Sequence, residues 1–145
     1  MQFIVEDRYT VEKGIAVRVP YIVISIRDPG RRPARLPRTG GLRGTLRLFF
    51  HDAEPSSGMT LPDSIQLMTV ADAERIWRFV QEHLGDIGAI VCHCEQGMSR
   101  SPAVAAALAE ALGEDPAPIV AWTQPNQTVY QMLKDTIARL QQEDM

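Results

Sequence analysis

The sequence predicts a single α/β domain over residues 1–145, with a central, mostly parallel sheet flanked by helices. Three observations predict this class: the chain has 145 residues, 45% of them are hydrophobic, and short β-branched segments alternate with segments of helical periodicity. Such alternation is typical of sheets whose strands run parallel. A domain of this size can bury a substantial core. The net charge of -3 shows no domain-wide basic excess, so no nucleic-acid partner is expected.

Three strands are expected, at residues 21–26, 46–50 and 89–93. The first two are short apolar runs bounded by turn-forming residues, and the third leads directly into a polar segment. Residues 29–44 hold three prolines and four glycines, which predicts a loop between the first two strands. We interpret this loop as solvated, and attraction of phosphorylated substrates is the alternative. Both interpretations concern the arginine-rich stretch 27–43, whose arginines are Arg27, Arg31, Arg32, Arg35, Arg38 and Arg43.

Helices are expected in three places. Apolar residues recur at the spacing of one helix face across residues 70–84, between the second and third strands. Residues 102–112 are almost all apolar, which is typical of a buried helix. A last helix is expected over residues 127–140, with Asn126 as its N-cap.

The turn from the third strand into the buried helix contains Cys94 and, six residues later, Arg100. This spacing alone is a weak signal, since composition predicts it by chance in about one such chain in five. The segment also has His93 before the cysteine, Gly97 three residues after it and Ser101 after the arginine. These additions lower the chance expectation to about one in a hundred thousand.

A strand-to-helix turn points successive amide groups inward, so it can hold a tetrahedral anion. Arg100 can grip two phosphate oxygens, and Gly97 allows the backbone a close approach. The same groups stabilise a thiolate at Cys94, placed for in-line attack on a bound phosphoryl group. Ser101 can donate a hydrogen bond to that sulfur when it leaves. The expected phosphate-binding residues are Glu95, Gln96, Gly97, Met98, Ser99 and Arg100.

The motif His93-Cys94-(five residues)-Arg100-Ser101 resembles the signature loop of the cysteine-dependent protein tyrosine phosphatase superfamily, in its compact dual-specificity branch. The resemblance implies a protein tyrosine phosphatase-like fold. It implies hydrolysis of phosphotyrosine, and also of phosphoserine and phosphothreonine, in proteins or peptides. The reaction would pass through a cysteinyl-phosphate intermediate and would need neither a metal nor another cofactor.

The family also uses an aspartic acid that protonates the leaving oxygen. Asp63 and Asp52 precede Cys94 by 31 and 42 residues, and the shorter spacing is closer to that usual in the family. Geometry favours Asp52, because it directly follows the strand at 46–50. The strands at 46–50 and 89–93 should run parallel, so their carboxyl ends would share the sheet edge where ligands bind. We therefore predict Asp52 as the general acid, with Asp63 as the alternative.

Other polar residues near the motif have plainer interpretations. His93 is expected to support the loop backbone rather than to act as a base. Cys92 is expected in the core, with a redox partnership to Cys94 as the alternative. His51 is expected to be exposed beside the acid loop. The Cys-x-His-Cys spacing is not a usual set of zinc ligands, so no metal is expected.

Several functional alternatives stay open. A phosphatase could act on a lipid or RNA phosphate, although positions 95–99 contain no cation of the kind that highly charged headgroups favour. The chain could be a catalytically inactive phospho-binding module. Arsenate reduction or sulfur transfer is a more distant alternative. No secretory signal or membrane span is visible and the cysteines form no disulfide framework, so a cytoplasmic protein is expected, without membrane contact and with its oligomeric state open.

Overall fold

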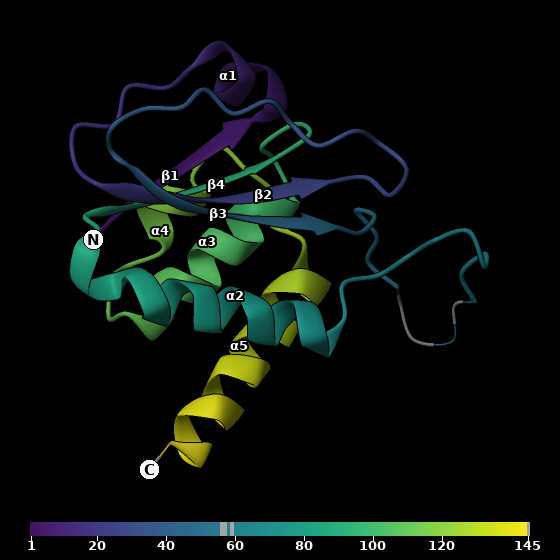
Figure 1. Ribbon diagram of the computed structural model, residues 1–145. Helices are drawn as coiled ribbons and strands as arrows, with labels where there is room; N and C mark the ends of the chain where they lie inside the picture. The colour runs from purple at the N-terminus through teal and green to yellow at the C-terminus, as the bar shows by residue number, and fades with distance from the viewer. Residues whose placement is uncertain (56–57, 59, 145) are drawn as a thin grey trace.

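A computed structural model describes residues 1–55, 58 and 60–144 of the chain. Figure 1 shows a central sheet with one short helix above it and the other helices below it. In chain order the elements are β1 (Gln2–Asp7), α1 (Arg8–Lys13), β2 (Tyr21–Arg27), β3 (Leu42–Phe49), α2 (Val70–His83), the 3₁₀ turn η1 (Leu84–Asp86), β4 (Ala89–Cys94), α3 (Arg100–Ala111), α4 (Ala117–Val120) and α5 (Gln127–Glu143).

The strands form one sheet in the order β1-β4-β2-β3, and every neighbouring pair is parallel. The predicted α/β class with a parallel sheet is confirmed. β4 lies inside the sheet, where Val91 pairs with Ile4 of β1 on one side and with Val23 of β2 on the other. Because the strands all point the same way, their carboxyl ends meet at one edge, where ligands bind in such sheets.

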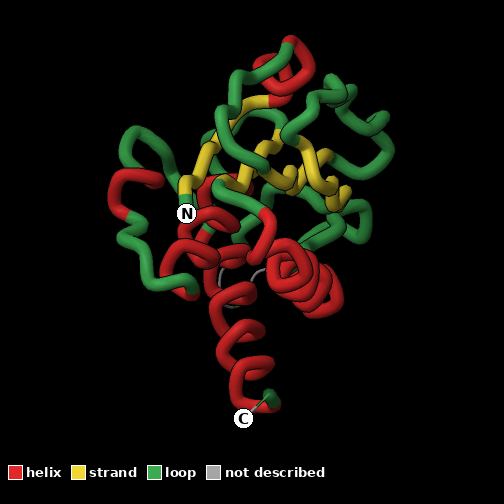
Figure 2. The backbone as a smooth tube through the Cα atoms, turned by 60° about the vertical axis from the view of Figure 1, so that its left-hand side comes forward, coloured by secondary structure: helices red, strands yellow, loops and turns green. Residues whose placement is uncertain are grey.

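The sheet is covered on both faces, as Figure 2 shows from a second direction. Ile22 and Ile24 of β2 belong to the main core, which the sheet shares with α2, α3 and α5. Tyr21 and Val23 belong to a smaller cluster with Val11 of α1. Successive side chains of a strand point to opposite faces, so burial of both faces explains why this strand is a continuous apolar run.

The helices α3 and α5 pack below the sheet and follow the segments that lie at its carboxyl edge. Every residue of α3 from Arg100 to Ala109 is buried, as its apolar sequence predicts. α5 is preceded by Asn126, whose side-chain oxygen accepts from the amide of Val129 at 3.0 Å, so the predicted N-cap is confirmed. This helix continues to Glu143, past its predicted end at residue 140. Throughout the described ranges, no helix combines the length and apolar character needed to cross a membrane.

The structure differs from the sequence prediction at the first two elements and at β3. β1 and α1 were not predicted, because β1 contains the polar residues Gln2, Glu6 and Asp7 and owes its conformation to pairing with β4. β3 begins at Leu42 rather than at residue 46. β2 also separates β3 from β4, so these two strands are parallel without being neighbours.

Candidate active site

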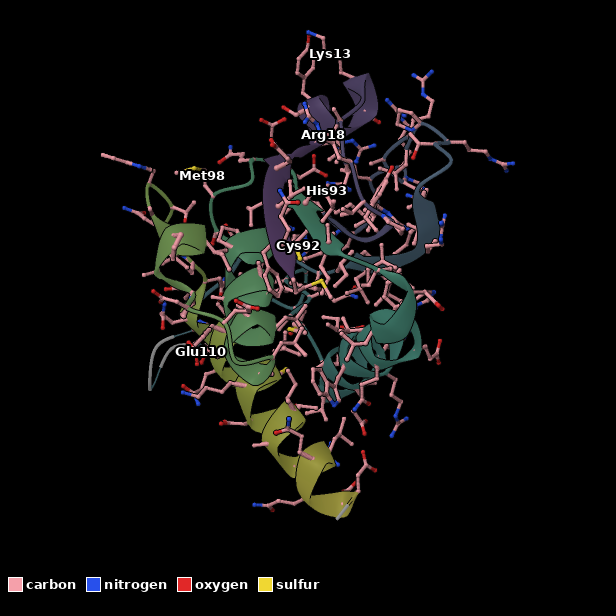
Figure 3. The ribbon with its side chains drawn as sticks, turned by 90° about the vertical axis from the view of Figure 1, so that its left-hand side faces the viewer. Lys13, Arg18, Cys92, His93, Met98 and Glu110 are labelled. Atoms are coloured by element: carbon pink, nitrogen blue, oxygen red, sulfur yellow. The ribbon has the colours of Figure 1, made fainter. Side chains whose placement is uncertain are left out.

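The segment 95–99 joins the end of β4 to the start of α3. Figure 3 labels Cys92 and His93 along β4 and Met98 at the outer side of the segment that follows. Gly97 has a φ of +71°, and a Cβ there would lie 2.8 Å from the carbonyl carbon of Glu6 and 2.9 Å from the amide nitrogen of Asp7. Glycine is therefore required both by the backbone angle and by the contact with β1. The unpredicted strand β1 thus forms one wall of this turn.

The sulfur of Cys94 lies within the turn and is 2% exposed as a residue. The amide of Gly97 donates to Sγ at 3.2 Å, and the hydroxyl of Ser101 lies 3.2 Å from the same sulfur. Both groups can donate a hydrogen bond to the sulfur when it is an anion. The structure therefore brings together the predicted nucleophile and its predicted hydroxyl partner.

Arg100 is the first residue of α3, and its guanidinium is held from outside the signature segment. Nη1 donates to the Asp28 carboxylate at 2.7 Å and to the carbonyl oxygen of Phe50 at 2.7 Å. A guanidinium has five N–H donors, so donors on Nε and Nη2 remain for a phosphate. Asp28 was not predicted as a site residue. It follows the carboxyl end of β2 directly, which is the same signal that favoured Asp52 after β3.

Asp52 lies at the site, at the end of β3. Its Oδ1 accepts from the hydroxyl of Ser99 at 2.7 Å and from the side-chain amide of Asn126 at 2.8 Å. The amide donor of Asn126 thus orients this carboxyl group, while its oxygen caps α5. Sequence reasoning found Asn126 only as a cap. Among the described residues, Ser99 makes no side-chain capping bond to α3, because its hydroxyl is committed to Asp52.

A cavity of about 330 Å³ opens over the sulfur of Cys94. Its walls include Asp28, Asp52 and Arg100, so these side chains face one space. Asp63 is exposed, and in the described part of the chain it is not among the residues that line this cavity. Of the two predicted acids, only Asp52 is therefore placed where it can face a phosphate bound over the cysteine.

Glu95, at the first variable position of the motif, is held by two arginines. Arg8 and Arg31 each approach its carboxylate at 3.2 Å. Arg8 is buried and also donates to the carbonyl oxygen of Arg32 at 2.7 Å. The arginine-rich segment therefore packs against α1 and the active-site turn, and part of its charge is neutralised there.

His93 and Cys92 lie on β4 and are fully buried. His93 Nδ1 donates to the carbonyl oxygen of Cys94 at 3.3 Å, so Nε2 accepts from the hydroxyl of Ser25 at 2.6 Å. Burial lowers the pKa of His93, which favours the neutral ring. Burial raises the pKa of the Cys92 thiol, with the nearby Cys94 adding to the effect. Cys92 belongs to the main core.

No group of three or more His, Cys, Asp or Glu side chains within the described residues is arranged to hold a metal ion.

Comparison with known proteins shows the class of fold. No protein-family model matches the chain, and no curated protein matches its sequence. Among solved structures, human DUSP28 matches with a TM-score of 0.60 and 18% identity, over 97% of this chain and 94% of that chain. Human tyrosine phosphatase-like serine/threonine/tyrosine-interacting protein matches with a TM-score of 0.54 and 20% identity, over 83% of this chain and 78% of that chain.

A structure of PTPMT1 in complex with PI(5)P matches with a TM-score of 0.50 and 14% identity, over 86% of this chain and 80% of that chain. The chain therefore has the fold of the cysteine-dependent protein tyrosine phosphatases, in the compact form of the dual-specificity phosphatases. The fold predicted from the signature loop is confirmed by these matches.

Proposed function

We propose that this protein is a cysteine-dependent phosphatase that hydrolyses phosphotyrosine in proteins or peptides, and phosphoserine and phosphothreonine as well. The observation that carries the proposal is the convergence of Cys94, Arg100 and Asp52 on one cavity. They are the nucleophile, the phosphate clamp and the acid that metal-free hydrolysis of a phosphomonoester needs. The fold shared with phosphatases adds support.

The first step forms a bond between the sulfur of Cys94 and phosphorus. The ester P–O bond breaks, and the leaving oxygen takes a proton from Asp52. A tyrosine leaving group has a pKa near 10 in water, so protonation lowers the barrier for its departure. Arg100 and the amides of residues 95–100 stabilise the charge on the remaining phosphate oxygens. The product is cysteinyl phosphate and the free hydroxyl of the substrate.

The second step releases phosphate. Asp52, now a carboxylate, takes a proton from a water molecule that attacks phosphorus from the side the leaving group vacated. The P–S bond breaks, and the electron pair returns to the sulfur of Cys94. Ser101, at 3.2 Å from that sulfur, donates a hydrogen bond to the departing thiolate. We assign these roles to the four residues predicted from sequence.

Asp28 also has a carboxyl group in the cavity and is therefore a second candidate for the general acid. Its contacts favour a different role. Asp28 forms an ion pair with Arg100 at 2.7 Å, which suits a carboxylate that positions the guanidinium. Asp52 accepts two bonds on Oδ1, from Ser99 and Asn126. This arrangement fixes its orientation and leaves Oδ2 for the transferred proton. We therefore assign acid catalysis to Asp52.

The contacts of Glu95 support a protein substrate over a highly charged lipid headgroup. Its carboxylate lines the cavity and pairs with both Arg8 and Arg31, so the variable part of the motif itself adds no positive charge for a second phosphate. A phosphorylated side chain presents a single phosphate.

We place the reaction in the cytoplasm, where a reducing environment keeps Cys94 in the thiol or thiolate form that the first step requires.

The test is hydrolysis of an aryl phosphate in EDTA between about pH 5 and 8. We expect activity in the wild-type protein, none in Cys94→Ser, and a loss of about 100-fold in Asp52→Asn. Asp63→Asn is the matched control and should retain full activity. Activity in Cys94→Ser would refute the mechanism.

A second measurement separates the alternatives. Tight phosphopeptide binding by a wild-type protein that releases no phosphate would favour an inactive binding module. A strong preference for a phosphoinositide or RNA phosphate over phosphopeptides would instead show a non-protein substrate.

A further inference from the structure

Trp122 is the most exposed large hydrophobic residue of the described chain, at 95% relative exposure. It lies in a tight turn in which the amide of Thr123 donates to the carbonyl oxygen of Val120 at 3.0 Å. Ala121 has φ -55° and ψ 132°, and Trp122 has a φ of 68°. These angles define a type II turn with Trp122 at the position that normally requires glycine. A bulky side chain held at positive φ and in solvent contributes little to the fold, which suggests a role in binding.

The Trp122 turn is fastened to the active-site segment. Two residues after it, the amide of Gln124 donates to the carbonyl oxygen of Met98 at 2.8 Å. The amide of Asn126 likewise donates to the carbonyl oxygen of Ser99 at 3.0 Å. Figure 3 shows Met98 on the outer side of this segment, and its side chain is 44% exposed. The chain that follows the turn is therefore tied to Met98 and Ser99, and both of these residues line the catalytic cavity.

A second hollow, of about 410 Å³, adjoins the catalytic cavity. Gln124 and Pro125, which directly follow the Trp122 turn, line it on one side, and Asp52, Met98 and Ser99 also line it. Asp52 and Ser99 belong to the walls of both spaces, so the two spaces are neighbours. A substrate whose phosphate is bound over Cys94 can therefore extend into the hollow, whose lining residue Gln124 is two residues from Trp122 in the chain.

The hollow is acidic. Its walls carry the carboxylate of Glu54 and the carboxyl group of Asp52, which the proposed first step uses as an acid. No lysine or arginine is among the described residues that line it. Glu54 Oε1 accepts from the amide of Gln127 at 2.8 Å, which fixes this carboxylate at the start of α5. The charge is complementary to a cation, and an indole face is the best aromatic partner for a guanidinium or ammonium group. An arginine has both the planar cation and an apolar stem that can cover Met98.

We infer that Trp122 and the hollow beside Glu54 form a docking surface for an arginine side chain close to the phosphorylated residue of a peptide substrate. The inference rests on the proposed phosphatase function, which it extends to substrate selection. The hollow shares Asp52 with the catalytic cavity. Trp122 lines neither space among the described residues, so we assign it contact with the substrate and no catalytic role.

The first experiment measures binding directly. The chain has two tryptophans, and Trp77 is buried at 3% exposure, so Trp77→Phe leaves Trp122 as the sole tryptophan, which excitation at wavelengths that tyrosine does not absorb reports selectively. In a Cys94→Ser, Trp77→Phe protein, we expect a phosphotyrosine peptide with a flanking arginine to change the Trp122 emission. The same peptide with alanine at that position should bind about 5-fold more weakly, the size of a partly desolvated cation–π contact.

The second experiment separates binding from folding. Trp122→Gly and Trp122→Ala should both remove the preference for the arginine peptide, measured as the ratio of kcat/KM for the two peptides. Glycine tolerates the positive φ, so the glycine variant should melt about 3 °C higher than the alanine variant. Equal loss of preference in two variants of unequal stability excludes a folding effect. Glu54→Gln keeps an acceptor for the Gln127 amide and should weaken the preference about 3-fold, a screened surface interaction.

Val19→Ala is the matched control, because Val19 is a partly exposed apolar residue beside Gly88, at the opposite edge of the sheet. Its peptide preference should equal that of the wild type. Equal affinity for the arginine and alanine peptides in the presence of Trp122 would overturn the inference. So would a Trp122 emission change produced by a nucleoside monophosphate or a phosphoinositide vesicle in place of the peptide. Hydrolysis of aryl phosphate with no arginine preference would overturn this inference alone, whereas absence of both activities would overturn the proposed function too.

Discussion

The Asp28 carboxylate lies 2.7 Å from the guanidinium of Arg100. The arginine that we propose to bind the phosphate therefore has an acidic partner that follows β2, whereas the arginine itself lies after β4. Asp28 and Arg100 also line the same cavity. The carboxylate therefore has two opposing effects. It holds the guanidinium in place, and its negative charge repels an incoming phosphate.

Two substitutions at Asp28 should separate these effects. Asp28→Asn keeps an acceptor for Arg100 and removes the charge, so inorganic phosphate should inhibit about 5-fold more tightly, as for one removed like charge at short range in water. Asp28→Ala also removes the acceptor and should lower kcat about 10-fold through loss of a positioned guanidinium. Aryl phosphate kinetics with phosphate as inhibitor test both. If Asp28→Asn instead lowers kcat as much as we expect for Asp52→Asn, Asp28 is the general acid.

Gly97 should be the least replaceable glycine of the chain. Gly97→Ala places a Cβ at φ +71° and 2.8 Å from the backbone of Glu6, and we expect a loss of about 3 kcal/mol in unfolding free energy. Gly113→Ala is the control, because its φ is +78° with nothing within 4 Å of the added Cβ. It should lose about 1 kcal/mol from backbone strain alone. Urea unfolding measures both, and equal losses would show that the contact with β1 contributes nothing.

The buried His93 should make stability depend on pH. Burial lowers its pKa in the folded state, so the unfolded chain binds a proton first as pH falls through the ordinary value of about 6.5. Stability should therefore be highest above that pH and decline below it, by at most about 1.4 kcal/mol per pH unit from this residue. His93→Gln lacks the titrating group, and its unfolding free energy should vary less between pH 5 and 7, a range of about two units. Identical slopes in the two proteins would contradict this assignment.

The two cysteines should differ sharply in reactivity. Burial raises the pKa of the Cys92 thiol, and Cys92 is fully buried in the core. Cys94 opens onto the cavity and has donors at its sulfur. Brief treatment with iodoacetamide at neutral pH should therefore label Cys94 and spare Cys92, as measured by peptide mass spectrometry. Phosphate should protect Cys94. Labelling of Cys92 at a comparable rate in the folded protein would show that the core opens there.

The sequence was informative where a local pattern determines the structure. The apolar run of β2, the helix periodicity of α2 and the N-cap of α5 are local patterns, and each predicted its element. β1 lacks such a pattern, since its conformation depends on pairing with β4. The partners of Arg100 were likewise hidden, because Asp28 and Arg100 are 72 residues apart and only the sheet order brings them together.

Two sequence signals disagreed on whether Asp52 or Asp63 reaches the cavity: the spacing to Cys94 and the direction of the strands. Spacing along the chain favoured Asp63, whereas the parallel direction of β3 and β4 favoured Asp52. The structure places Asp52 in the cavity wall. Position relative to a strand end was therefore the better guide to which of the two residues lines the cavity, and the role of Asp52 as the acid stays a prediction.

Ser99 commits its hydroxyl to Asp52 and leaves the start of α3 without a side-chain cap among the described residues. A helix start without such a cap forgoes about 1 kcal/mol of stability. A bound anion can supply the missing partner, and a ligand that binds only the folded chain stabilises it by mass action. Ambient phosphate, the product of the proposed reaction, would then set both the occupancy of the site and the folded fraction of the protein. The concentration of phosphate would then affect both the rate of the proposed reaction and the lifetime of the folded protein.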